Sequence, residues 1–190
     1  ATLGETSERL DATAMHQLTG SRHYVSGLYT PGTVMIQPAG YIRSLGRGLR
    51  RDGIRICETT PVRQIRRSGP DWVLATSGGE VTAARVILAN NGHLESFGFV
   101  PNRLMHVFLF ASMTVELDAD AQRQLGGAPR WGVTPSDPMG TTMRRIDTAL
   151  GGNRIITRSC ASFCPDMETS AAALRRAKRI HHRKFSDRFP

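Results

Sequence analysis

The chain has 190 residues, 39% of them hydrophobic and 22% charged, which is enough for a buried core and excludes a disordered tail. Its longest apolar runs fall far short of the roughly 20 residues that a membrane span needs, so we expect no such span. A net charge of +9 puts nucleic acid, anionic lipid and acidic ligands among the partners to consider.

The first predicted elements are a helix and two strands. Apolar residues at helical spacing in Thr6–Leu18 predict a short amphipathic helix that ends at Gly20. The runs Tyr24–Tyr29 and Thr33–Gln37 lie on either side of Pro31-Gly32. Two such runs about a Pro-Gly turn predict a hairpin or a paired connection.

A second helix and strand follow. Tyr41–Arg51 has its apolar residues on one face, and Gly53 is placed to end the helix. Ile54–Glu58 then predicts a short buried strand. A helix, a one-glycine turn and a strand of β-branched residues are typical of the second half of a βαβ unit.

A meander and a buried strand are predicted next. Val62–Arg66, Trp72–Thr76 and Glu80–Thr82 alternate apolar and polar side chains around glycine-containing turns, which predicts a small antiparallel sheet. Ala84–Ala89 is continuously apolar and runs into Asn90-Asn91-Gly92-His93. A strand that is buried on both faces and ends in small, turn-forming residues is where open α/β sheets bind ligands.

The second half of the chain predicts longer strands and one basic helix. The strands fall within Leu104–Leu117, Gly140–Ile146 and Arg154–Arg158, and the helix within Ser170–Lys184. The loops between the strands are rich in Gly, Pro and Asp, which is typical of an antiparallel sheet.

The cysteines indicate a cellular compartment, and the two ends of the chain indicate how much of the protein is present. Cys57, Cys160 and Cys164 are odd in number and sparse, which favours a reducing cytosol and a cytoplasmic location. Ala1–Leu10 has neither the basic head nor the apolar core of a signal peptide. The chain lacks an initiator Met and stops at Phe189–Pro190, so we expect it to be part of a longer protein.

Several blocks together resemble the D-amino-acid oxidase family of FAD-dependent amine oxidoreductases, which includes glycine oxidase, sarcosine oxidase and gamma-glutamylputrescine oxidase. They occur in family order over nearly the whole chain. The blocks are Gln37-Pro38-Ala39-Gly40-Tyr41, Gly53-Ile54-Arg55-Ile56, Thr60-Pro61-Val62-Arg63-Gln64-Ile65, Trp72-Val73-Leu74-Ala75-Thr76, Arg85-Val86-Ile87-Leu88-Ala89-Asn90-Asn91-Gly92, Met143-Arg144-Arg145-Ile146 and Asn153-Arg154-Ile155-Ile156. Gly92-His93-Leu94 is most similar to the gamma-glutamylputrescine oxidase-like branch.

The resemblance implies a mixed α/β (α+β) fold, with part of an FAD-binding dinucleotide domain and an antiparallel-sheet substrate domain. We expect residues 1–36 and 99–168 in the substrate domain, 37–98 in the FAD-binding domain, and 169–190 as a basic helix leading back to it. No G-x-G-x-x-G occurs, although that fingerprint places the FAD pyrophosphate at a helix N-terminus. The flavin site is therefore incomplete in this sequence.

The resemblance also implies cofactor-binding residues. The backbone of Val62 takes the position that contacts the FAD adenine, and the alternative is an ordinary core valine. Ala89, Asn90 and Gly92 follow a predicted strand, where small residues let a cofactor approach the backbone. The alternative there is a plain tight turn, which Asn-Gly forms readily. His93 we take for a turn residue.

Arg145 is the candidate for substrate binding. By resemblance its strand lines the substrate cavity, where a guanidinium would hold a substrate carboxylate in a two-pronged pair. Arg144 is then expected on the opposite side, because neighbours on a strand alternate. The alternative is that both are surface arginines at a sheet edge.

A cysteine pair and a basic segment could also indicate a metal site and a nucleic-acid or lipid site. Cys160-x-x-x-Cys164 has no second pair and no matched histidines, so we expect no metal site. The basic segment Arg175–Lys184 could bind nucleic acid or lipid. Its apolar residues recur at near-helical spacing without stacking aromatics among the charges, so we predict the solvated face of a docked helix and no nucleic-acid partner.

The predicted function of the longer parent protein is that of an FAD-dependent amine or amino-acid oxidase or dehydrogenase acting on a small molecule, and we expect these 190 residues alone to be inactive. The family chemistry is hydride transfer from the amine-bearing carbon to the flavin N5, followed by imine hydrolysis and reoxidation by oxygen or another acceptor. The alternative is a catalytically silent, flavin-free fragment, or a basic binding module on a degenerate flavoprotein scaffold.

Overall fold

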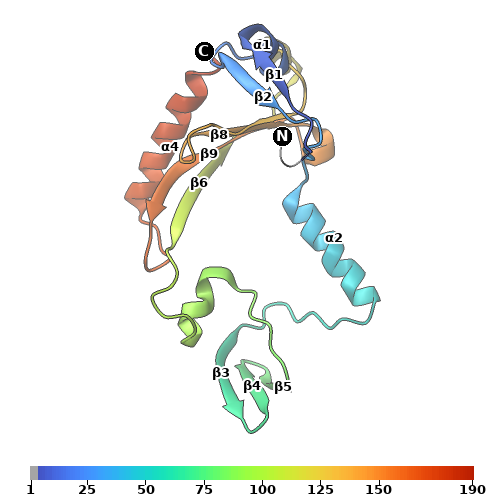
Figure 1. Ribbon diagram of the computed structural model, residues 1–190, viewed down its shortest axis with the longest axis vertical. Helices are drawn as coiled ribbons and strands as arrows, with labels where there is room; N and C mark the ends of the chain where they lie inside the picture. The colour runs from blue at the N-terminus through green and yellow to red at the C-terminus, as the bar shows by residue number, and fades with distance from the viewer. Residues whose placement is uncertain (1–3) are drawn as a thin grey trace. The chain divides into compact units, whose positions relative to one another are not determined.

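The computed structural model describes residues 4–190 and divides the chain into two units (Figure 1). One unit comprises residues up to Pro38 together with Val107–Pro190, and the other comprises Ala39–His106. All the strand pairs are antiparallel among the described residues. This confirms the mixed α/β class with an antiparallel sheet.

The first unit is built on a four-stranded sheet in the order β6-β9-β8-β7. Its strands are β6 (Val107–Met113), β7 (Trp131–Val133), β8 (Thr142–Ile146) and β9 (Arg154–Phe163). The predicted strands of the second half of the chain are thus confirmed in position. Helix α4 (Ala171–Ser186) packs along β6 and β9 (Figure 1). It begins where the Ser170 hydroxyl accepts a hydrogen bond from the Ala173 N–H at 3.1 Å.

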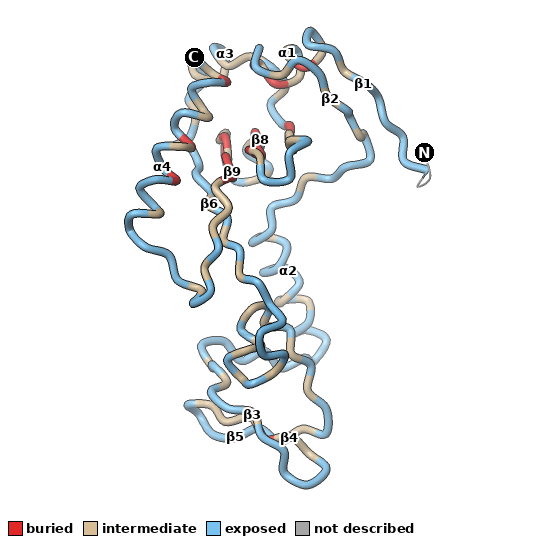
Figure 2. Tube along the Cα trace, turned by 60° about the vertical axis from the view of Figure 1, so that its left-hand side comes forward, coloured by how far each residue is buried: buried red, intermediate tan, exposed pale blue. Residues whose placement is uncertain are grey.

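The remaining elements of this unit lie near the ends of the sheet strands. Strands β1 (Glu8–Asp11) and β2 (Ser26–Tyr29) pair with each other, and helix α1 (Ala12–Thr19) lies between them in the sequence. The short helices are α3 (Ala119–Leu125) and the 3-10 turn η2 (Thr148–Leu150). The buried residues of this unit cluster on β8, β9, α1 and α4 (Figure 2).

Two predictions for the N-terminal region were wrong. The helix expected over Thr6–Leu18 is shorter, because Asp11 caps its start by accepting from the Ala14 N–H and the residues before it form β1. Thr33–Gln37 is not a strand, and β2 pairs with β1. Thr33–Gln37 pairs with no strand among residues 4–190, so the Pro-Gly turn closes no hairpin.

The second unit contains α2 (Pro38–Arg51), the meander β3 (Val62–Ser68), β4 (Asp71–Thr76) and β5 (Gly79–Ala83), and the 3-10 segment η1 (Asn91–Phe97). The sheet order β3-β4-β5 confirms the predicted meander.

Two strands predicted for this unit are absent. Ile54–Glu58 and Ala84–Ala89 have no strand assignment, and Ile87 is 92% exposed. A strand needs a neighbour to satisfy its N–H and C=O groups, and no strand among residues 4–190 pairs with either segment. Their apolar sequence alone does not supply that partner.

Candidate functional site

The cofactor candidates all belong to the second unit. Val62 is the first residue of β3, and Ala89 and Asn90 lie on the stretch between β5 and η1. Gly92 is in the first turn of η1. Ala89 is exposed, whereas Val62, Asn90 and Gly92 are partly buried. Their cofactor roles stay a prediction.

Asn90 is distinguished by an unsatisfied side chain. It precedes η1 without capping it, although its backbone carbonyl accepts from the His93 N–H at 3.2 Å. Both polar atoms of its amide, Nδ2 and Oδ1, are buried and have no hydrogen-bond partner. Such a group costs free energy unless a ligand or solvent satisfies it. The Asn90 amide can therefore donate to and accept from a bound molecule.

Arg145 lies on β8 between Trp131 of β7 and Ile155 of β9. Its side chain is buried, with 5% of the residue exposed, and its guanidinium donates to the Gly126 carbonyl. Burial lowers the pKa of Arg145 from its usual value. No contact within the chain tests its predicted role in substrate binding, which stays a prediction.

The two faces of the sheet differ strongly around Arg145. Met143, Arg145, Ile155 and Thr157 alternate with their neighbours along β8 and β9 and are buried, on the face that α4 covers. Arg144, in contrast, is exposed on the opposite face. The predicted alternation of the two arginines is thus present.

A second arginine occupies the face that carries Arg144. Arg158 is exposed and donates from Nη2 to the Thr142 hydroxyl at 3.3 Å. Exposed Leu109 and Met113 of β6 lie on the same face by strand alternation. Sequence analysis did not single out Arg158. Its signal was available, because Arg144 and Arg158 each alternate with buried residues on adjoining predicted strands.

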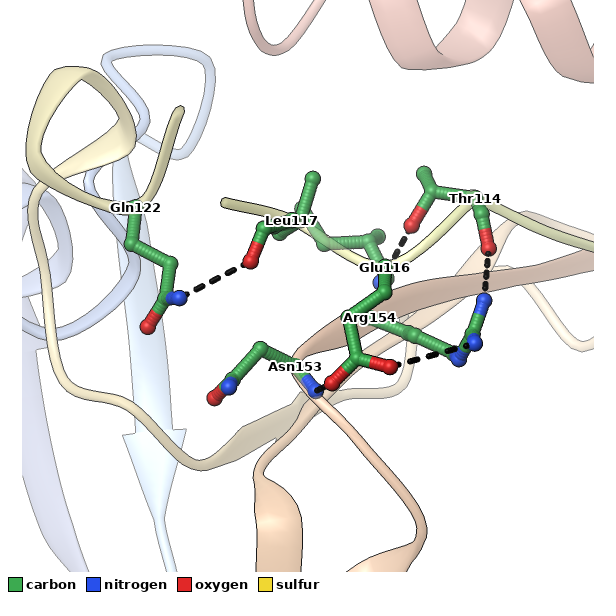
Figure 3. Close-up of polar contacts among 7 residues, drawn as sticks. Thr114, Glu116, Leu117, Gln122, Asn153 and Arg154 are labelled. Atoms are coloured by element: carbon green, nitrogen blue, oxygen red, sulfur yellow. Dashed lines mark hydrogen bonds and ion pairs between the residues drawn. The ribbon is translucent and has the colours of Figure 1, made fainter. Parts of the chain in front are cut away.

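Arg154 at the start of β9 is satisfied within the chain (Figure 3). Its guanidinium donates to the Thr114 carbonyl at 3.0 Å and pairs with the Glu116 carboxylate at 3.4 Å. The same carboxylate accepts from the Asn153 N–H at 3.3 Å. The Gln122 amide donates to the Leu117 carbonyl at 2.9 Å. These contacts fix the connection between β6 and α3 against the first residues of β9.

The covered face of the sheet holds α4 through a buried histidine. His181 is 3% exposed, and its Nδ1 lies 2.7 Å from the Ser112 hydroxyl of β6. Burial lowers the pKa of His181, and the Ser159 backbone partly offsets this. Next to it lies a cavity of about 470 Å³ with a mainly apolar lining that includes Phe110, Ile155 and Phe185. This face is therefore a packing interface with a small void.

The described residues contain neither a metal-ligand cluster nor a membrane-spanning helix. Within residues 4–190, no group of three His, Cys, Asp or Glu side chains is placed to hold a metal ion. None of the helices in that same range has the length and apolar character to cross a membrane.

The chain is of mixed α/β class, with an antiparallel sheet against which α4 packs. The chain belongs to the DAO family of FAD-dependent oxidoreductases, whose family model matches residues 1–188. The prediction from sequence resemblance is thereby confirmed at the level of family and cofactor.

Relatives of known name agree with this assignment. The chain is 29% identical over 109 residues to "Probable oxidoreductase OrdL" of Rhizobium meliloti (strain 1021), a match that covers 57% of this chain and 26% of OrdL. Glycine oxidase from Geobacillus kaustophilus has a similar fold, with a TM-score of 0.68 and 18% identity over 95% of this chain and 47% of that one.

NikD, described as an unusual amino acid oxidase essential for nikkomycin biosynthesis, has a TM-score of 0.69 and 16% identity. The match covers 100% of this chain and 50% of NikD. The chain thus spans about half the length of the solved structures to which it is similar.

The residues present fit part of a flavin site. The unsatisfied amide of Asn90 offers one donor and one acceptor to a bound group. The exposed backbone at Ala89 leaves room for a close approach. No glycine-rich fingerprint occurs in the 190 residues, so the pyrophosphate is not held by that device here.

Proposed function

We propose that the protein oxidises the C–N bond of a small amine or amino acid in the cytoplasm. The observation that carries the proposal is the family match along residues 1–188. It is supported by folds shared with two amino-acid-directed oxidases, glycine oxidase and NikD. Three cysteines without disulfides accord with a reducing compartment.

In this proposal the second unit contributes to cofactor binding. The Val62 backbone at the start of β3 and the stretch Ala89, Asn90 and Gly92 contact FAD, with the Asn90 amide finding its missing hydrogen-bond partners there. FAD, when bound, supplies the two-electron acceptor for the oxidation. The protein's part is then to bind and orient the amine and to exclude water.

The sheet of the first unit contributes to substrate binding. Its arginines can hold a carboxylate, because a guanidinium matches a carboxylate with two parallel hydrogen bonds. Arg145 is the candidate from sequence resemblance. In the structure its guanidinium is bound to the Gly126 carbonyl, so substrate binding by Arg145 requires that contact to be shared or exchanged.

The first experiment is to measure bound flavin in the purified protein. Visible absorption, followed by fluorescence of the released cofactor after denaturation, gives the flavin stoichiometry. For the intact protein we expect near-stoichiometric FAD and reduction of its absorbance by amines or amino acids under anaerobic conditions. Absence of flavin even after incubation with FAD would overturn the proposal for this chain and favour a catalytically silent module.

The Asn90→Leu variant tests the cofactor role of the unsatisfied amide. Leu has a similar volume but cannot hydrogen-bond, so we expect weaker FAD binding by about 5- to 10-fold, which corresponds to one lost hydrogen bond of about 1 kcal/mol. Thr82→Leu, at an exposed position on β5 of the same unit, is the control. Unchanged FAD affinity in Asn90→Leu would remove this residue from the site.

A further inference from the structure

Helix α4 does not fill the space between itself and the sheet. The cavity of about 470 Å³ there is lined by α4, β6 and β9, and its volume is within the range of small-molecule sites. Ala177 of α4 is buried in the lining and contributes only a methyl group, so part of the space stays unfilled. The helix residues that line the cavity recur at the three- and four-residue spacing of one face: Leu174, Ala177, Lys178, His181, His182 and Phe185.

The interior of this cavity suits an apolar molecule. Phe110 of β6 and Ile155 of β9 line its sheet side, and Ile155 is 1% exposed. Ser112 and His181 also line it, but they are engaged with each other, because the Ser112 hydroxyl lies 2.7 Å from the His181 Nδ1. The other ring nitrogen, Nε2, is buried. Mainly apolar cavities bind small apolar molecules, so the interior favours the hydrocarbon part of a ligand.

The edge of the cavity is cationic. Among the described residues of the lining, Lys178 is the one Lys or Arg, and none is Asp or Glu. Lys178 is exposed and forms no ion pair within residues 4–190. Its aliphatic stem can therefore border the cavity while its ammonium stays in water. Leu174, one turn earlier, is 52% exposed and extends the apolar lining to the same edge. Charge complementarity thus favours an anionic group at this edge.

We propose that this cavity binds an amphipathic anion of the medium-chain fatty-acid class. Its hydrocarbon chain lies between α4 and the sheet, and its carboxylate lies at the Lys178 ammonium. Burial lowers the pKa of His181, so that ring is neutral at neutral pH and leaves the ligand's charge to Lys178. None of the lining residues is among those proposed to bind FAD or the amine. The site is therefore a function additional to the proposed oxidation.

The first test compares three ligands by calorimetry on the intact protein. Octanoate has both a chain and a charge, octanamide has the chain alone, and butyrate has the charge on a short chain. We expect octanoate to bind at least 10-fold more tightly than butyrate, because each buried methylene raises affinity by about fourfold. We expect it to bind about two- to fivefold more tightly than octanamide, as for an exposed ion pair.

Three variants of α4 separate the charge from the apolar lining. Lys178→Met keeps most of the stem, and it should lower octanoate affinity by about two- to fivefold without changing octanamide affinity. Arg176→Met, at an exposed cation of α4 outside the lining, is the matched control and should change neither. Leu174→Ser should weaken both ligands, by about two- to fivefold. Far-UV circular dichroism on each variant shows that the fold is retained.

Three results would overturn the inference. Absence of octanoate binding would mean that the cavity is closed or filled in the intact protein. Equal losses in Lys178→Met and Arg176→Met would mean that octanoate senses the overall positive charge of α4 rather than this cavity. Binding of phosphatidylglycerol vesicles without binding of free octanoate would assign the helix to a lipid surface. None of these results depends on amine oxidation, so the inference and the proposed function can fail separately.

Discussion

Each face of the β6-β9-β8-β7 sheet carries a methionine and an arginine, but these side chains are buried on one face and exposed on the other. On the face that α4 covers, Met143 is fully buried and Arg145 is bound to a backbone carbonyl. On the other face, Met113 is 58% exposed and Arg144 is unpaired among the described residues. Strand alternation therefore places Met143 and Arg145 in the packed interior on one face and Arg144 in solvent on the other, where the neighbouring Thr142 and Ile146 are nevertheless buried.

The largest effect expected from this division is the loss of a buried methionine. Met143→Ala should lower the free energy of unfolding by about 2–5 kcal/mol, because it removes fully buried apolar volume and leaves a void. Met113→Ala on the opposite face is the matched control and should cost within about 0.5 kcal/mol. Urea unfolding of both variants measures the difference. Equal losses would mean that the second face is also packed in solution.

The two adjacent arginines give the next comparison. Arg145→Met should lower the free energy of unfolding by about 1–3 kcal/mol, because the Gly126 carbonyl loses its donor in a partly buried setting. Arg144→Met should be close to neutral, since an exposed side chain without partners is removed. Thermal unfolding of the two variants checks this. A larger loss for Arg144→Met would reverse the assignment of the faces.

His181 makes the docking of α4 depend on pH. Its pKa is lowered in the folded protein by burial, so the unfolded chain binds more protons below the ordinary histidine pKa of about 6.5. The stabilising contribution is complete above pH 6.5 and is lost as the pH falls through the folded-state pKa.

The pH dependence is measured as the free energy of unfolding between pH 5 and pH 8 in wild type and His181→Gln. The variant should show a shallower loss on the acid side. His23, whose pKa is also lowered, first by burial and then by Arg188, contributes in the same direction and is unchanged in the variant. Identical pH profiles would show that His181 is not the responsible group.

Sequence patterns predicted those elements whose partners are close in the chain. The β3-β4-β5 meander was correct because its strands are joined by turns of a few residues and satisfy one another. The strands expected at Ile54–Glu58 and Ala84–Ala89 were wrong because a strand of that kind depends on a distant neighbour. Local hydrophobicity does not say whether that neighbour is present.

The sequence predicted that Arg144 and Arg145 lie on opposite faces of the sheet, but not which of the two faces is covered. Alternation placed Arg144 and Arg145 on opposite faces, and the structure agrees. Which face is covered depends on α4, which follows β8 by more than 20 residues, and on Gly126, 19 residues before Arg145. No local pattern at Arg145 carries that information. The unsatisfied state of Asn90 likewise depends on how its surroundings fold.

The smallest expected effect concerns Arg154, which lies on the same sheet face as Arg144 and is paired with Glu116. Glu116→Gln removes the carboxylate that pairs with Arg154 at 3.4 Å, in a pair that is partly exposed (Figure 3). We expect a loss of only about 0.2–1 kcal/mol in the free energy of unfolding, and a smaller loss in 1 M salt, because exposed pairs are weak and screened. Urea unfolding of wild type and Glu116→Gln at low salt and in 1 M salt measures both losses, and a loss that salt does not reduce would mean that the Arg154–Glu116 pair is not its cause.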